Sequence, residues 1–129
     1  MQDRPSVDEL LEAVAGFLHD DVMPNTEGRL SFHARVASNV IEMLRRELAS
    51  EEEHLSREWT GLDGLLGARV RPESLSELRA AVIERNRELS RRIQEGQADD
   101  GATRGAVVEH LRSVARDKLA VSNPKLIRD

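Results

Sequence analysis

Apolar residues recur at intervals of three and four along most of the chain, which is the spacing of a helix with one buried face. The first run covers Val7 to Val22. It follows Ser6 and a glutamate three residues further on, the spacing of a helix-capping box, and it stops at Pro24. A second run covers about Ser31 to Ala49. The pattern therefore predicts two helices joined by a loop over about residues 23–30.

Two further helical segments are expected in the middle of the chain. Another capping-box serine, Ser50, opens a segment that we expect to stay short, because glycines interrupt it at positions 61, 64 and 67. The next segment begins after Ser74, which has a glutamate three residues later, and ends near Gly96. Its arginines alternate with glutamates, which is typical of a solvated face held by ion pairs between neighbouring turns.

The last apolar run covers residues 107–121 and is closed by Asn123 and Pro124, after a loop predicted from the stretch GQADDGATRG. Strict alternation of apolar and polar residues, the pattern of a strand, does not occur. We therefore expect an all-α fold, an antiparallel-type bundle of four main helices plus one or two short ones. Residues 1–129 are expected to form a single domain with a short flexible tail at about 124–129.

Composition narrows the functional classes. A chain of 129 residues can bury one core, and its aromatic content of 2% means that leucine, valine, isoleucine and alanine must fill it. The net charge of −5 lacks the basic excess that attracts nucleic acid. Cysteine is absent, and the sequence shows neither a signal peptide nor a membrane-length apolar stretch. We expect a cytoplasmic protein without nucleic-acid or membrane partners.

Polar residues stand on the apolar faces of three predicted helices. On a helical wheel His33 falls near the centre of the apolar half of its helix, and Asn39 lies at the edge of that half. Lys118 lies inside the stripe of the last helix, and Asn86 flanks the stripe of the helix before it. Each can be a satisfied structural residue, with His33 bonded to a core acceptor and Lys118 extending to water. Alternatively the four converge on one polar pocket.

Metal and nucleophilic chemistry find little support in the sequence. Glu51 and His54 have the Glu-x-x-His spacing of carboxylate-bridged di-iron bundles, but such a site needs a second copy of the motif. The glutamates at 51–53 are better explained as a negative first turn of a helix. We expect no metal, no cofactor and no catalytic residue.

Four segments resemble an uncharacterised family of short bacterial proteins, a domain of unknown function. They are DRPSVDELLEAVAGFL, GRLSFHARVASN, RNRELSRRI and KLAVSNPK. Genes of that family lie beside those of aminoglycoside-phosphotransferase-like kinases and acyl-CoA dehydrogenases, so the resemblance implies a small accessory protein and no activity. The family's recurring polar positions correspond here to Arg29, His33, Arg35, Asn39, Asn86, Arg92 and Lys118.

Two functions follow as hypotheses. The first is a non-enzymatic accessory or protein-interaction bundle that acts with a phosphotransferase-like kinase or an acyl-CoA dehydrogenase. The second is a protein that binds an anionic or acyl-CoA-type small molecule in a polar pocket around His33, with Arg29, Arg35 and Arg92 as accessory residues. A homodimer is also expected, with Leu62, Leu65 and Leu66 exposed at its contact surface.

Overall fold

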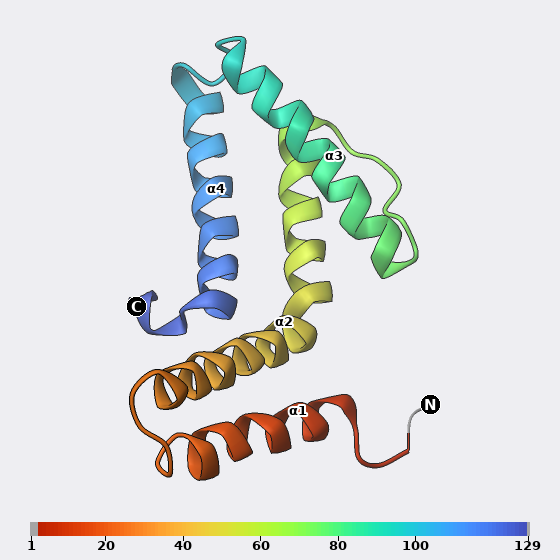
Figure 1. The fold of residues 1–129 in the computed structure, drawn as a ribbon. Helices are drawn as coiled ribbons and strands as arrows, with labels where there is room; N and C mark the ends of the chain where they lie inside the picture. Colours follow the sequence, from red (N-terminus) through yellow and green to blue (C-terminus); the bar gives the residue numbers. More distant parts are fainter. Residues whose placement is uncertain (1–2, 129) are drawn as a thin grey trace. The chain divides into compact units, whose positions relative to one another are not determined.

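The structure, a computed structural model, describes residues 3–128. Its helices, shown in Figure 1, are α1 (Val7–Gly16), α2 (Gly28–Leu66), α3 (Leu75–Gln94) and α4 (Gly101–Ser122). A π-helical turn, η1 (Phe17–Val22), continues α1, and a 3-10 turn, η2 (Pro124–Leu126), follows α4. Within the described range no strand occurs, and the predicted all-α fold is confirmed.

The chain divides into two compact units. Unit 1 is Met1–Ala49, and unit 2 is Ser50–Asp129. Helix α2 contributes its first part to unit 1 and its last part to unit 2. The expectation of one domain over the whole chain stays a prediction.

Unit 1 is an antiparallel hairpin of α1 with the first part of α2. The predicted capping box is present, since the Ser6 hydroxyl accepts from the Glu9 amide while the Glu9 carboxylate accepts from the Ser6 amide. Hydrogen bonds cross between the helices at three successive levels, from Ser31 to Met23, from Ser38 to Ala15 and from Arg45 to Asp8. The residues buried between the helices are small, namely Ala15, Ala34 and Ser38.

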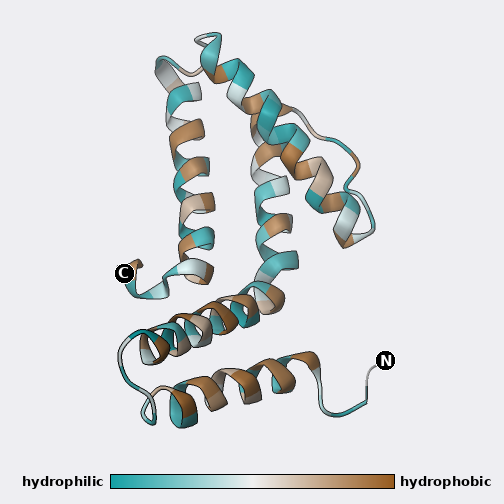
Figure 2. Ribbon diagram, viewed as in Figure 1, coloured by the Kyte–Doolittle hydropathy of each residue, from teal (hydrophilic) through white to brown (hydrophobic). Residues whose placement is uncertain are grey.

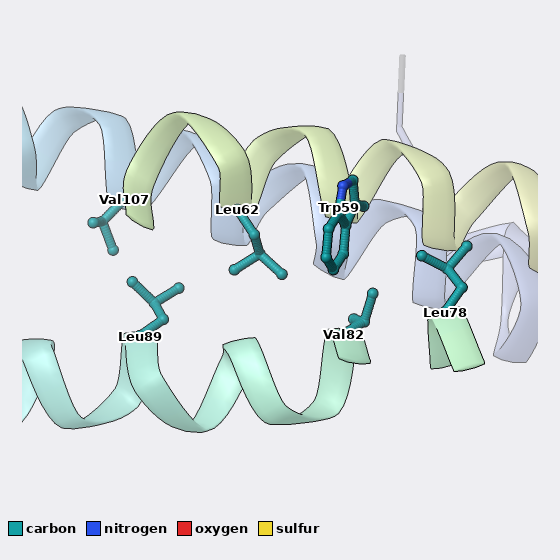
Figure 3. Packing of buried hydrophobic residues seen from close by; sticks show 6 residues of the cluster. All are labelled: Trp59, Leu62, Leu78, Val82, Leu89 and Val107. Atoms are coloured by element: carbon teal, nitrogen blue, oxygen red, sulfur yellow. The ribbon is translucent and has the colours of Figure 1, made fainter. Parts of the chain in front are cut away.

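Unit 2 combines the last part of α2 with α3 and α4 around a common apolar core. Figure 3 shows its buried side chains pointing toward one another from the three helices: Trp59, Leu62, Leu78, Val82, Leu89 and Val107. Leu62 and Leu78 are completely buried. The Ser74 hydroxyl caps α3 by accepting from the Glu77 amide, as its spacing predicts.

The expected break after Ala49 is wrong. Residues 28–66 form one continuous helix, so Ser50 lies within a helix and begins none. A glycine in a helix costs about 1 kcal/mol. Packing of Trp59 and Leu62 in the core of unit 2 outweighs that cost at Gly61 and Gly64. The helix ends instead at Gly67, whose φ of +98° favours glycine.

Two other expectations also need correction. Helix α4 begins at Gly101, so it includes part of the stretch for which the sequence predicts a loop. Leu62 is fully buried, and Leu65 and Leu66 pack against the same core, so these leucines do not form an exposed contact surface.

Candidate functional site

His33 lies at the surface of unit 1. Its ring is exposed, and its Nε2 accepts a hydrogen bond of 3.2 Å from Nε of Arg29, one helical turn earlier. The ring also makes an edge contact with Phe32, with the ring centroids 5.6 Å apart. The helical wheel places His33 on the apolar face correctly, but within unit 1 nothing encloses that face. The structure thus brings two predicted residues together, Arg29 and His33.

The other predicted site residues are distributed over both units. Asn39 and Arg35 are exposed on α2 in unit 1, and Lys118 is exposed on α4 in unit 2. Asn86 is half-buried in unit 2, where its Nδ2 donates to the Glu58 carboxylate at 2.6 Å. A pocket shared by His33, Asn39, Asn86 and Lys118 stays a prediction. Of the accessory residues, Arg92 pairs with Glu88 at 2.8 Å, one turn away on α3.

Large apolar side chains are exposed along both helices of the hairpin. Figure 2 shows hydrophobic bands along α1 and along the first part of α2. Ten of these side chains are 41–61% exposed, and we call them the hairpin face: Val7, Leu10, Val14, Phe17, Leu30, Phe32, Val36, Val40, Leu44 and Leu48. So many large apolar side chains exposed on one unit indicate an interaction site, because a monomer rarely exposes a large apolar surface.

Inside unit 2 a buried arginine connects α3 to the end of α2. The Arg85 side chain is only 3% exposed and lies over the Trp59 ring, with its guanidinium carbon 4.5 Å from the ring centroid. It donates to the Asp63 carboxylate and to the carbonyls of Leu62 and Gly67. The hydrogen bond from Arg85 lowers the pKa of Asp63 below its usual value.

The sequence predicts this arginine as part of a solvated face, and that prediction is wrong for Arg85. Arg79 is exposed, but it pairs with Glu51 of α2 and not with a glutamate of its own helix. Arg87, Arg91 and Arg92 do pair with glutamates on neighbouring turns of the same helix. The sequence contained a signal, because Arg85 follows Leu78 and Val82 and precedes Leu89 at the spacing of the buried stripe.

His110 is the second buried polar residue that the sequence reading missed. It is 9% exposed on α4, its Nε2 has no hydrogen-bond partner in the described structure, and Gly61 of α2 lies directly against its ring. Burial lowers the pKa of His110, and the nearby Glu58 carboxylate partly opposes that shift. Its spacing indicates burial, since His110 follows the buried Val107 by three residues and so lies on the same face of the helix.

A polar groove runs between α2 and α4 of unit 2. One part, about 480 Å³, is lined by Arg57, Glu109, Arg112, Ser113, Arg116 and Asp117. An adjoining part, about 360 Å³, shares three of these residues and adds Gly61, Gly64, Leu65, Ala106 and His110. The Arg57 guanidinium pairs with Asp117 and with Glu53, which leaves Arg112 and Arg116 as the cations that can meet an anion.

Glu51 and His54, which have the spacing of a di-iron motif, each lie close to a side chain of another helix. Glu51 binds Arg79 of α3 at 2.5 Å, and the His54 Nε2 lies 3.8 Å from an Asp117 oxygen. Across residues 3–128, no three histidine, aspartate or glutamate side chains gather in a way that could hold a metal ion.

A family model, described as domain of unknown function (DUF6285), matches residues 24–126. The chain belongs to this family. The matched segment contains α2, α3 and α4 and all seven polar positions that the resemblance indicates. No curated protein and no solved structure matches the chain.

In the part of the chain that the structure describes, none of the helices has the length and apolar character needed to cross a bilayer.

Proposed function

We propose that this DUF6285 protein is a cytoplasmic helical interaction module that acts by binding other proteins and not by chemistry of its own. The observation that carries this proposal is the hairpin face. Within the described residues, unit 1 exposes ten large apolar side chains, whereas the longer unit 2 exposes seven. Since burying such surface is the main driving force of protein association, this face is the natural contact surface.

The first partners to test are a phosphotransferase-like kinase and an acyl-CoA dehydrogenase, the classes that the family resemblance implies. Each would be purified and titrated with the full chain by isothermal calorimetry. We expect one of them to bind with a Kd below about 10 μM. Absence of heat with both, at concentrations about ten times higher, would reject the accessory role with these enzymes.

A matched pair of variants locates the contact. Val14→Asp puts a carboxylate on the hairpin face, and Ile83→Asp puts one on α3 at a position of equal exposure, 49% against 48%. We expect Val14→Asp to weaken binding at least about tenfold, because a charge would have to be desolvated. Ile83→Asp should bind like the natural chain. Equal loss in both variants would show that the hairpin face is not the contact.

A second candidate function is the binding of a small anionic molecule, favoured by the groove between α2 and α4. Arg112 and Arg116 line it beside a less polar recess at Gly61 and Ala106, which suits a carboxylate attached to a short apolar group. Butyrate and acetyl phosphate are suitable probes. If the groove binds them, Arg112→Gln should weaken binding about tenfold, while Arg87→Gln on the solvated face of α3 should have no effect.

A further inference from the structure

The exposed apolar residues of α2 have a symmetric register. Five of them recur at every fourth position: Phe32, Val36, Val40, Leu44 and Leu48. Such a row forms a ridge along one side of a helix. Two apolar residues stand at equal distances on each side of Val40. An antiparallel copy of α2 centred on Val40 would therefore place Phe32 at the level of Leu48, Val36 at the level of Leu44, and Val40 against itself.

Two polar residues on the same face fit this register. His33 and Glu47 each lie seven residues from Val40, on opposite sides, and at 100° per residue both lie within about 20° of the centre of the ridge. Both are exposed. In the antiparallel pairing His33 of one copy meets Glu47 of the second copy, and the contact occurs twice. This pairing gives a reason for a histidine in the middle of an apolar face.

The size of the face also fits a pair of copies. A stable protein interface buries about 800 Å² on each partner. Ten large apolar side chains that are each about half exposed provide an area of that order, supplied by α1 as well as α2. The small residues between the helices, Ala15, Ala34 and Ser38, bury little apolar surface by themselves. Two such hairpins joined face to face form a four-helix bundle.

We infer that the hairpin face binds a second copy of this chain, with α2 antiparallel to its copy about a two-fold axis at Val40. The inference rests on the proposed function, in that it takes the hairpin face to be an interaction surface, and it names the occupant. Because a two-fold interface is self-complementary, every favourable contact is made twice.

The first test is the mass of the full-length protein in solution. Sedimentation equilibrium should give twice the chain mass of 14.5 kDa at micromolar concentration. Val40→Asp places two carboxylates against each other at the axis and should raise the dissociation constant at least about a hundredfold. Ile83→Asp, equally exposed on α3, should remain dimeric. Circular dichroism shows whether Val40→Asp retains the helix content of the natural chain.

The second test uses this polar pair and depends on the register. His33→Glu alone puts two pairs of carboxylates in contact, and Glu47→Lys alone removes the carboxylate acceptor that His33 meets, so each variant should self-associate at least about tenfold more weakly. A mixture of the two variants should form a heterodimer. In that heterodimer the introduced glutamate meets the introduced lysine, and the unchanged Glu47 of one chain meets the unchanged His33 of the other. Native mass spectrometry measures the three species directly. A statistical 1:2:1 mixture would overturn the register.

A chain that is monomeric at every concentration would overturn the inference. If the monomer still binds one of the partner enzymes through Val14, the proposed function stands while this inference fails. If the dimer forms and neither enzyme binds, the inference stands while the accessory role fails.

Discussion

Gly61 and His110 are packed so closely that a side chain at position 61 has no space. A Cβ built on Gly61 would lie 2.7 Å from Cε1 of His110 and would overlap Nδ1, whereas at Gly64, one turn along, nothing lies within 4 Å. The ring is buried, so it cannot move aside freely. The residue at position 61 therefore decides how closely α2 and α4 approach.

Gly61→Ala should destabilise the protein by about 1–3 kcal/mol, because overpacking forces the ring or a helix to shift. Gly64→Ala is the matched control and should be neutral or stabilising by up to about 1 kcal/mol, since alanine is the better helix former. Urea unfolding followed by the fluorescence of Trp59, the chain's single tryptophan, measures both. Equal effects of the two substitutions would show that the helices are not in close contact at Gly61.

The buried His110 gives the stability of unit 2 a pH dependence. Its pKa is lowered from the ordinary value of 6.5, so between 6.5 and the lower folded-state pKa the unfolded chain binds a proton that the folded chain does not. The free energy of unfolding should therefore fall as the pH drops from about 7 to about 5. Asp63 has a pKa below its ordinary 3.8, so its stabilising effect is lost only at more acidic pH.

The measurement is the urea midpoint of the Trp59 signal from about pH 7 to about pH 5. His110→Gln should flatten this profile because glutamine does not titrate, whatever its effect on stability at neutral pH. His19→Gln, at an exposed position on η1 in unit 1, is the matched control for replacing a histidine. A profile that stays steep in His110→Gln would assign the pH dependence to another group.

At the scale of the elements, α3 is fixed to the carboxyl end of α2 by Arg85. Arg85 donates to the carbonyls of Leu62 and Gly67, on either side of that helix end, as well as to the Asp63 carboxylate. The capping residues Ser6 and Ser74 could be predicted from local sequence alone. The continuity of α2 could not, because it depends on packing between distant residues.

Arg85→Ala should cost about 3 kcal/mol, since it removes a donor from Asp63 and from the two carbonyls as well as the contact with Trp59. Arg87→Ala breaks an exposed ion pair on the same helix and should change stability by less than about 0.5 kcal/mol. Thermal unfolding by circular dichroism, converted with the measured enthalpy, compares the two. A small effect of Arg85→Ala would mean that water replaces the guanidinium at little cost.

Helical periodicity also identified which residues share a face, but not what covers that face. The wheel placed His33 among apolar residues correctly, yet a residue that faces a core and one that faces an interface have the same spacing. For the same reason Leu62 was expected at a surface and is fully buried. Arg85 and His110 stand at the spacing of the buried residues, but arginine and histidine are residue types that are usually exposed to solvent. Only the three-dimensional packing shows which residues of a helix face are buried.

On the scale of the whole molecule, the two units differ in what stabilises them. Unit 2 contains the described core cluster, and unit 1 buries mainly small side chains between its two helices. If the hairpin pairs with a second copy, the stability of unit 1 depends on protein concentration and that of unit 2 does not.

Hydrogen exchange followed by mass spectrometry tests this difference on the full chain. Amides of residues 7–49 should exchange faster at about 0.1 μM than at about 100 μM, because dilution favours the dissociated hairpin. Amides of residues 55–66 and 78–89 should exchange at the same rate at both concentrations. Concentration-independent exchange in both units would show that unit 1 is stable within a single chain.

The alanine and serine contact between α1 and α2 has a consequence for the cell. The residues buried between the two helices are Ala15, Ala34 and Ser38, so the large apolar side chains of the hairpin face stay exposed in an unpaired chain. Proteases and chaperones recognise such exposed apolar segments. Expression level would then set the fraction of chains that survive, and a newly made subunit would persist only after meeting another.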